Sequence, residues 1–514
     1  MKGLKSRTKF IVYILVLILI FVGYQFQQQV EIMRQPPSEK WGKEVNISNG
    51  KVTRNMKLIK YGYNYIALHN DDFNYKIIEF DYLGNVIKAN EIQSDDLNGI
   101  YDLSLNLKDD FIYINALTKG KDVIYLETLK LNNNLQLISC ETEVLPNNKC
   151  FEHIDENIFI TSDQHHIEIH DYKTGETKKV QVPLALDEVM GIKINDEYLI
   201  VYHAEDEYFY YFTYNNGKIS EAKPFLKVKK GVSTSYNQPV IASDGNNFYF
   251  ITDIIKKGGY FNTLFSQVNI QSGNASKYVF SNLIMKNLKG FYSQDGGRFI
   301  YTSPSKQVVD MIIKDGKIIE EKNISRLSSL NINSYLIDDI AIFANFESKD
   351  FYNVYVSSIG EEYKIKNNIL RKVDIKMAAE KEIKSLFNVI TYFFLLGTAW
   401  VLPLFAAACI YSLISFRLVK KNKIKSYLVF SLIGILFTTF EIFNYYYSRR
   451  LIHYGILQNP IIGISVSVII SASIYGYYLY KYNKDTEGLF MERFLPPLLV
   501  DTLLILVLFV PFGL

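Results

Sequence analysis

Tryptophan, cysteine and net charge are all scarce in this sequence. It holds 2 Trp and 3 Cys among 514 residues, and 56 basic against 53 acidic residues leave a formal charge of +3. So small an excess, with no basic stripe interleaved with aromatic residues, argues against a nucleic-acid partner. No nucleophile elbow, phosphate-cradling glycine loop or H-E-x-x-H pattern occurs either. The sequence therefore offers no recognisable catalytic motif.

The three cysteines have two different settings. Cys409 lies in an apolar run, where it is expected to be a small buried hydrophobe. Cys140 and Cys150 lie in a strand-rich region with nine residues between them. If this region faces the cell exterior, a disulfide between them is expected, and two reduced thiols are the alternative.

An apolar run near the N terminus predicts a membrane anchor. Residues Phe10–Phe26 are uncharged and follow four basic residues. With its flanks, such a run suffices to cross the hydrocarbon core as a helix. The small residues of a signal-peptidase site do not follow it, so an uncleaved anchor at residues 1–28 is favoured over a cleaved signal peptide.

The C-terminal quarter predicts four more transmembrane helices. A linker helix at 369–385 precedes a membrane domain at 386–514, whose apolar runs are Leu386–Phe416, Tyr427–Tyr447, Ile456–Tyr480 and Phe494–Leu514. The segments 417–425 and 481–487 between them are short and basic, which places them in the cytoplasm with the basic N terminus. A multi-pass plasma-membrane protein results, with the middle of the chain and the C terminus outside the cytoplasm.

A repeat organises the middle of the chain. An apolar strand after a polar turn recurs seven times at spacings of 40 to 51 residues. The first apolar residues of these strands are Tyr65, Phe111, Ile158, Tyr198, Phe248, Phe299 and Ile340. A Gly- or Asn-rich hairpin turn follows each strand, centred on Gly84, Asn133, Gly175, Gly217, Gly273, Gly316 and Gly360. Asn-Gly and Asp-Gly favour two-residue hairpins because both central residues need positive φ.

Each period holds about four short strands, and a four-stranded sheet is the blade of a β-propeller. The predicted fold class is an all-β seven-bladed propeller at 55–368, joined by a linker at 29–54 and placed between one N-terminal and about four C-terminal transmembrane helices. Six or eight blades remain open if the first or last repeat closes by strand exchange. An open array of β-sandwiches is the alternative fold.

The pattern resembles the broad propeller superfamily of WD, NHL and quinoprotein-type repeats, without a subfamily signature. No Trp-Asp dipeptide closes the blades, and residues 55–368 contain no Trp. Quinoprotein propellers use tryptophan docking motifs, so the resemblance argues against a quinone cofactor. Joined to a multi-helix membrane domain, the whole resembles membrane proteins of Gram-positive bacteria.

Two patterns in the repeat region are candidate metal sites. Strand alternation places His166, Glu168 and His170 on one face, and imidazole with carboxylate suits zinc. Side chains two apart on a strand point in parallel, however, so a packed or solvated strand face is the alternative. Asp-rich turns such as Asp244–Asn247 offer oxygen ligands for calcium, although Asx turns explain them as well.

Two acids lie within the apolar C-terminal runs, Glu441 and Asp501. Intramembrane acids are costly and therefore count as functional candidates in a proton or ion path. A hydrogen bond to a neighbouring helix is the alternative. Gly463, Ser467 and Ser471 recur every four residues, a stripe that suits close helix packing.

Three functions follow from these patterns. The first is a non-enzymatic binding or scaffold module whose partners are the lipid bilayer and a membrane or envelope protein. The second is a transport or sensing unit that uses Glu441 and Asp501. The third is a surface hydrolase, which predicts two facing carboxylates at the mouth of the propeller channel.

Overall fold

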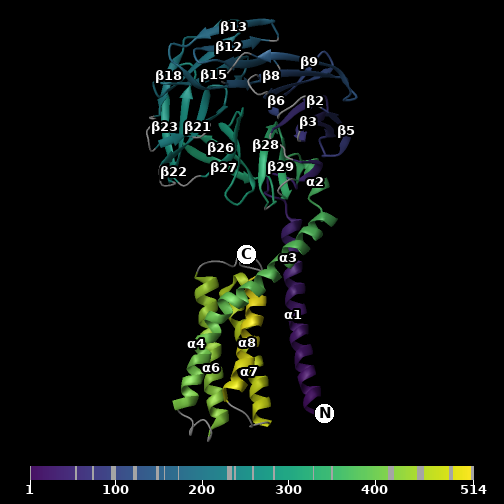
Figure 1. Cartoon of the computed structure of the whole chain (residues 1–514), viewed down its shortest axis with the longest axis vertical. Helices are drawn as coiled ribbons and strands as arrows, with labels where there is room; N and C mark the ends of the chain where they lie inside the picture. Colours follow the sequence, from purple (N-terminus) through teal and green to yellow (C-terminus); the bar gives the residue numbers. More distant parts are fainter. Residues whose placement is uncertain are drawn as a thin grey trace. The chain divides into compact units, whose positions relative to one another are not determined.

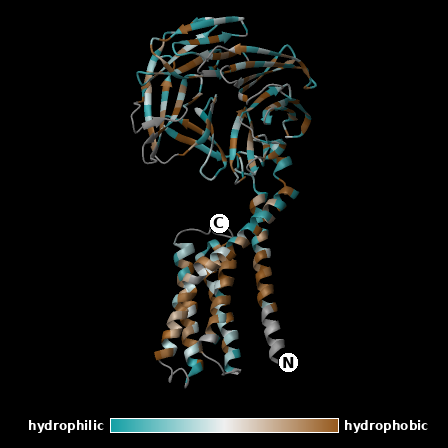
Figure 2. Ribbon diagram, in the orientation of Figure 1, coloured by the Kyte–Doolittle hydropathy of each residue, from teal (hydrophilic) through white to brown (hydrophobic). Residues whose placement is uncertain are grey.

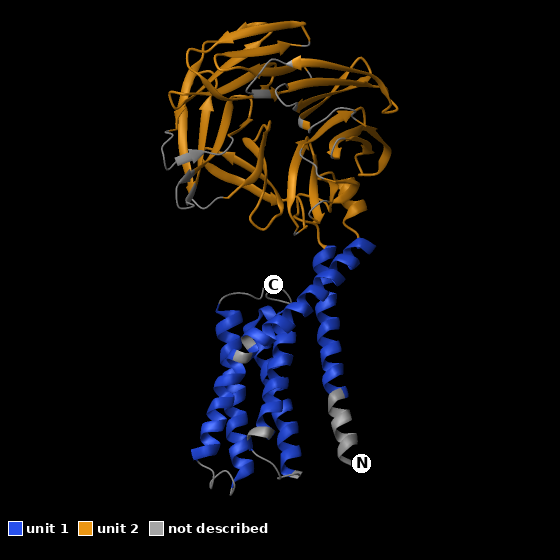
Figure 3. Cartoon of the chain, viewed as in Figure 1, with its two compact units in different colours: residues 1–34, 370–514 blue, residues 35–369 orange. Residues whose placement is uncertain are grey.

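The computed structural model describes the chain apart from residue 1 and a set of short segments. These segments are 52–54, 72–73, 94–99, 120–123, 146–149, 156, 172, 229–233, 237–238, 257–259, 282–283, 328, 349–350, 415–421, 449–455, 485–489 and 511–514. The chain divides into two compact units (Figure 3). One unit is Gln35–Ile369, and the other combines Met1–Arg34 with Leu370–Leu514.

The unit Gln35–Ile369 is built from seven antiparallel sheets of four or five strands each (Figure 1). The first three, from the innermost strand outward, are β2 (Met56–Tyr61), β3 (Asn64–Asp71), β4 (Asn74–Asp81) and β5 (Val86–Gln93); β6 (Ile100–Lys108), β7 (Phe111–Lys119), β8 (Ile124–Leu131) and β9 (Leu137–Leu145); and β10 (Cys150–His153), β11 (Ile158–Ser162), β12 (His166–Asp171) and β13 (Glu176–Gln181).

The fourth and fifth sheets each contain five strands. They are β14 (Leu186–Ile194), β15 (Glu197–Ala204), β16 (Tyr208–Asn215), β17 (Lys218–Ile219) and β18 (Lys223–Lys227); and β19 (Thr234–Tyr236), β20 (Val240–Ser243), β21 (Asn247–Lys256), β22 (Tyr260–Asn269) and β23 (Ala275–Ser281). The last two are β24 (Lys286–Phe291), β25 (Gly297–Thr302), β26 (Val308–Lys314) and β27 (Lys317–Asn323); and β28 (Asn331–Ile337), β29 (Ile340–Ser348), β30 (Phe351–Ser358) and β1 (Val45–Gly50).

The seven sheets form a closed ring. The innermost strand β2 contacts both β6 and β28, β24 contacts β20 and β28, and β14 contacts β10 and β20. The first strand, β1, pairs with β30 and so supplies the fourth strand of the last sheet, with Val45 opposite Val356. The predicted seven-bladed propeller is confirmed. Strand β1 lies in the segment 29–54, which was predicted to be a linker. It could not be recognised as a strand from the sequence because its pairing partner is about three hundred residues away.

The repeat seen in the sequence is the second strand of each sheet. These strands are buried on both faces, as in β11 and β15, and therefore read as apolar runs. Six of the seven predicted turns join the third and fourth strands of a sheet, and Asn216–Gly217 has the positive φ values of 45° and 79° that such a turn requires. The turn predicted at Gly360 is wrong. Gly360 caps helix α2 (Glu361–Asn367), because the fourth strand of that sheet comes from β1.

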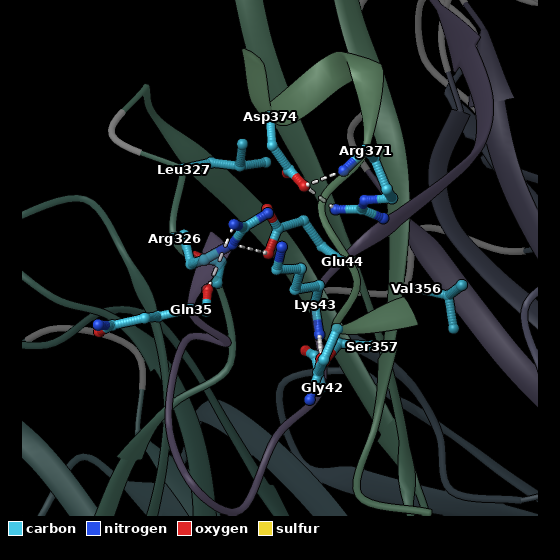
Figure 4. Close-up of polar contacts among 12 residues, drawn as sticks. Gln35, Gly42, Lys43, Glu44, Arg326, Leu327, Val356, Ser357, Arg371 and Asp374 are labelled. Carbon is cyan, nitrogen blue, oxygen red and sulfur yellow. Dashed lines mark hydrogen bonds and ion pairs between the residues drawn. The ribbon is translucent and has the colours of Figure 1, made fainter. Parts of the chain in front are cut away.

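Residues 35–44, here called the entry strap, are bound tightly to the propeller. Trp41 is fully buried, and its Nε1 donates to Asp310 Oδ2 at 3.3 Å. The buried carboxylate of Glu44 pairs with Arg326 at 2.9 Å (Figure 4). Lys43 Nζ donates to the carbonyl of Ile369 at 3.0 Å, so the start and the end of this unit are hydrogen-bonded to each other.

The other unit is helical. Its elements are α1 (Lys2–Arg34), α3 (Lys372–Tyr392), the π-helix η1 (Phe393–Gly397), α4 (Thr398–Ile414), α6 (Lys423–Ile442), the π-helix η2 (Phe443–Tyr447), the 3₁₀ turn η3 (Ile456–Gln458), α7 (Pro460–Lys484) and α8 (Phe490–Phe509). Apolar residues dominate these helices, whereas polar and apolar residues alternate in the sheets (Figure 2).

Four stretches of helix are long and apolar enough to cross a membrane: Val12–Arg34, Lys372–Ile414, Lys423–Tyr447 and Pro460–Asn483. Helix α8 packs against α4, α6 and α7 as a further helix of the same unit. One N-terminal and about four C-terminal helices, as predicted, are therefore present. Helix α1 is fastened to α8 by Gln25, whose Nε2 donates to the carbonyls of Val507 and Leu508 at 2.7 and 3.2 Å. These carbonyls lie in the last turn of α8, where helix carbonyls commonly need partners from outside the helix.

Candidate functional site

The innermost strands of six of the seven sheets each carry one polar side chain that interacts electrostatically with others of the same group. These six residues are here called the axial cluster. All six side chains are half-buried. The members are Lys57 on β2, Asp102 on β6, Glu152 on β10, Glu188 on β14, Lys289 on β24 and Tyr335 on β28. Innermost strands surround the central axis of a propeller, so one side chain from each of six sheets is gathered there.

The axial cluster is divided by sign. Lys289, Tyr335 and Lys57 lie on three successive strands of the ring, β24, β28 and β2. The ammonium groups of Lys289 and Lys57 lie 5.4 and 5.7 Å from the centroid of the Tyr335 ring, within the range of cation–π attraction. The three carboxylates follow on β6, β10 and β14. One half of the ring is therefore basic and the other half acidic.

The charges of the two halves act on each other. Burial and the carboxylate of Asp102 raise the pKa of Glu152 to about 8. Burial and the positive charge of Lys57 lower the pKa of Lys289 to about 8. Burial alone would lower the pKa of Lys57, but Asp102, Tyr335 and Glu152 together outweigh it and raise that pKa above its ordinary value. His153, next to Glu152, has its pKa lowered to about 3 by burial and by Lys57.

The lysines and the acidic residues of the axial cluster do not form direct ion pairs with each other in the described part of the chain. In the part of the chain that the structure describes, the charged groups of Lys57, Lys289 and Glu152 make no hydrogen bond and no ion pair within 4.0 Å. Charged side chains that are partly withdrawn from water normally have such partners. The charged groups of these three residues therefore retain hydrogen-bonding capacity that no described residue uses.

Close packing of the inner strands holds the basic half in place. Gly290 follows Lys289 on β24, and a Cβ atom at this position would collide with the carbonyl oxygen of Ile241 on β20. Only glycine lets the two strands approach this closely.

The axial cluster was not predicted from the sequence, because its members come from six repeats. A weak signal was present. In six periods a charged residue or a tyrosine lies five to ten residues ahead of the repeated apolar position, as Lys57 does before Tyr65 and Asp102 before Phe111. This places it on the strand preceding the second strand of each sheet, which is the innermost one.

The predicted His166, Glu168 and His170 lie on one face of β12, where each side chain has a partner of its own. His166 Nδ1 lies 3.0 Å from Asp163 Oδ2, and Glu168 accepts from Lys179 at 3.0 Å. His170 bonds to Thr161 at 3.0 Å and stacks on Phe159 with ring centroids 4.1 Å apart. Across the described residues, no group of three or more His, Cys, Asp or Glu is arranged to hold a metal ion.

Asp244 and Cys140 do not belong to the axial cluster. Asp244 Oδ1 accepts from the backbone N–H groups of Asn246 and Asn247 at 2.9 and 2.7 Å, as in an Asx turn. Cys140 is exposed on the outermost strand β9, with its Sγ 3.7 Å from Glu127 Oε1. The side chain of Cys150 lies outside the described residues, so the disulfide remains a prediction.

Of the two predicted intramembrane acids, Asp501 joins three helices. It is fully buried on α8, and it accepts from Ser471 of α7 at 2.7 Å and from Thr438 of α6 at 3.2 Å. Glu441 is half-buried on α6. No hydrogen bond or ion pair connects it to Asp501 among the residues described. The structure thus shows no direct pairing of the two acids, although Glu441 lies one turn of α6 from Thr438, which bonds to Asp501.

The small-residue stripe of α7 contacts two other elements. A Cβ atom at Gly463 would clash with the hydroxyl of Tyr447 in η2, so glycine is required for this contact. Ser467 donates to the carbonyl of Gly463 at 2.7 Å within the helix, and Ser471 donates to Asp501.

Comparison with known proteins adds little to this description. No family model and no curated protein matches the sequence. Among solved structures, BBS1N in complex with ARL6DN is 10% identical, with 62% of this chain and 96% of that chain covered at a TM-score of 0.41. A chain of the mitotic checkpoint complex is 8% identical, with 61% and 93% covered and a TM-score of 0.40. An oligogalacturonate lyase from Vibrio parahaemolyticus is 10% identical, with 63% and 100% covered and a TM-score of 0.39. The assignment as a seven-bladed propeller rests on the strand pairing of this chain itself.

Proposed function

We propose that this chain is a membrane-anchored, non-enzymatic binding module. Its helices hold the propeller at the outer side of the plasma membrane, and the propeller binds a ligand or an envelope partner at the axial cluster. One observation supports this most strongly: the charged groups of Lys57, Lys289 and Glu152 are half-buried at the axis, and among the described residues they have no hydrogen bond or ion pair within 4.0 Å. A ligand that pairs with these charges would offset the cost of withdrawing them from water.

The helical unit supports the location. Its apolar stretches suit a bilayer, and the short basic segments between them favour a cytoplasmic position for the ends of the helices that they join. Several helices exceed what tethering requires, which supports docking to a second membrane protein.

Photo-crosslinking at the axis tests the proposal. Tyr335 is replaced by p-benzoylphenylalanine in the full chain, and Tyr63, 94% exposed in the turn between β2 and β3, is the matched control. We expect intact-mass analysis after irradiation of cells to show an adduct at position 335 that is absent at position 63. The adduct should also be lost in a Lys57→Met/Glu152→Gln background. Equal adducts at both positions, or none at the axis, would contradict binding at the axial cluster.

A surface hydrolase is a second candidate, because carboxylates from β6, β10 and β14 belong to the axial cluster. A raised pKa keeps Glu152 protonated near neutral pH, as a general acid requires, beside the carboxylate of Asp102. Glu152→Gln distinguishes the candidates. Loss of product formation from envelope polysaccharide, with the ligand still bound, would favour hydrolysis. If the chain is a binding module, neither the wild-type protein nor the Glu152→Gln variant forms a product.

A further inference from the structure

The two halves of the axial cluster impose different demands on a ligand. The ammonium groups of Lys57 and Lys289 each lie within 6 Å of the Tyr335 ring centroid. Two ammonium groups brought this close repel each other, and an anionic group between them removes the repulsion while accepting hydrogen bonds from both. The nearby ring of Tyr335 offers an apolar surface for the adjoining carbon atoms of such a ligand.

The acidic half has the opposite demand. Asp102, Glu152 and Glu188 lie on three neighbouring innermost strands, β6, β10 and β14. An ammonium group offers three hydrogen-bond donors and a positive charge, so it can be bound by the carboxyl groups of Asp102 and Glu152, which lie on adjoining innermost strands. A metal ion is not favoured here, since no metal-binding group of three side chains occurs in the described part of the chain.

We infer that the axial cluster binds a zwitterion, with its anionic group between Lys57 and Lys289 and its primary ammonium among the carboxyl groups of the opposite half. This inference rests on the proposed binding function and adds the chemistry of the ligand. A ligand with only one charge satisfies one half and desolvates the other half without compensation. A ligand with both charges, spaced to match, satisfies both halves at once.

A series of aminoalkyl phosphates tests the inference directly. Aminoethyl, aminopropyl and aminobutyl phosphate are titrated into the full chain in detergent micelles, with binding measured by calorimetry. The alkyl phosphate and the alkylamine of each length are the controls that carry one charge. We expect affinity to pass through a maximum along the series, and at that length to exceed both controls by about tenfold or more.

Variants separate the two halves. Lys57→Met/Lys289→Met should weaken the zwitterion and the alkyl phosphate but leave the weak binding of the alkylamine unchanged. Asp102→Asn/Glu152→Gln should weaken the zwitterion and the alkylamine but not the alkyl phosphate. The exposed pair on the outermost strand β13, with Lys178 Nζ 2.9 Å from Glu176, supplies a matched control variant, Lys178→Met/Glu176→Gln, with no expected effect. Thermal unfolding of every variant shows which of them retain the fold.

Competing vesicles identify the source of the ligand. Phosphatidylglycerol vesicles are compared with and without phosphatidylethanolamine, whose headgroup carries a phosphate and a primary ammonium. Competition only by the vesicles that contain phosphatidylethanolamine assigns the site to a lipid headgroup and supports a zwitterion. No competition, together with tight binding of an aminoalkyl phosphate, assigns the site to a soluble zwitterion. Equal competition by both kinds of vesicle would contradict the inference, because phosphatidylglycerol carries no ammonium group.

Two results would overturn the inference, and they differ in what they say about the proposed function. Equal affinity for the zwitterion and a control with one charge, weakened by the axial variants, refutes the zwitterion but keeps binding at the axis. No binding of any compound, together with no adduct at position 335, refutes both. Weakening by the β13 control variant would also refute the inference, because binding would then lie elsewhere.

Discussion

The side chain of His69 connects three strands of the propeller. It is fully buried on β3 and contacts Tyr352 Oη at 2.7 Å through Nδ1 and Ser48 Oγ at 2.9 Å through Nε2. Since Tyr352 donates its own proton to the carbonyl of Asn70, His69 Nδ1 must be the donor and Nε2 the acceptor. One neutral imidazole thus connects β3 with the two strands that close the ring, β1 and β30.

The pKa of His69 predicts a loss of stability in acid. Burial lowers this pKa from 6.5 to about 4, so the folded protein holds the neutral ring. The stabilisation is complete above the unfolded pKa of 6.5 and is lost as the pH falls toward 4, by about 3 kcal/mol in total. His69→Gln keeps a donor and an acceptor but does not titrate, so its melting temperature should fall less between pH 7 and pH 4. Parallel melting curves for both proteins would contradict this.

Asp501 is expected to act as a structural clasp between three helices. Removing it by Asp501→Ala leaves the hydroxyls of Ser471 and Thr438 without this acceptor, at a cost of about 1–2 kcal/mol within a membrane bundle. A double-mutant cycle with Ser471→Ala, measured by unfolding in mixed micelles, should give a coupling energy of about 1 kcal/mol. A bundle of unchanged stability would contradict the clasp. If cells that carry a stable Glu441→Gln/Asp501→Asn protein behave like cells that lack the protein, this would instead indicate a transport role for the two acids.

At the scale of elements, the entry strap depends on a buried ion pair. The side chains of Arg326 and Glu44 are 9% and 1% exposed. Arg326→Met removes the guanidinium from a buried carboxylate and should destabilise the strap by about 3–5 kcal/mol, whereas Arg326→Met/Glu44→Gln should recover much of this loss. Trp41 reports the change by fluorescence once Trp400→Phe has removed the other tryptophan.

The exposed pair on β13 provides the control for this measurement. Lys178→Met should shift stability by less than about 0.5 kcal/mol, because solvent screens an exposed pair. If Arg326→Met had an equally small effect, the ion pair would not be what holds the strap.

The strands that could be predicted from the sequence are those whose buried residues recur in a regular pattern. The second strand of each blade packs on both faces, so its apolar run appears at nearly constant spacing, and the type I′ turn at Asn216–Gly217 has its own sequence signature. Strand β1 could not be predicted, because its partner β30 is remote in sequence. The axial cluster was missed for a related reason: Glu152 and Lys289 lie on short inner strands of different repeats, and only the closed ring brings them together.

At the scale of the whole molecule, the predicted orientation can be tested with introduced cysteines. In a chain whose own cysteines are replaced by serine, Tyr63→Cys on the propeller should react with a membrane-impermeant maleimide in intact cells. Asn483→Cys, exposed near the end of α7, should react only after permeabilisation. Hydropathy predicts where the helices lie, but their direction depends on the charge of short connecting segments. The opposite labelling pattern would reverse the orientation.

The pairing of β1 with β30 also has a consequence for biosynthesis. Val45 leaves the ribosome about three hundred residues before Val356, its partner. At ordinary rates of translation this interval lasts roughly 15–60 s. During that time β1 and the entry strap remain attached to an already inserted helix with an unpaired strand edge, which is a template for association with other chains. The ring therefore closes late, when β30 emerges and while α4 to α8 are still unmade, and a chaperone acting on the nascent chain would have its greatest effect within this interval.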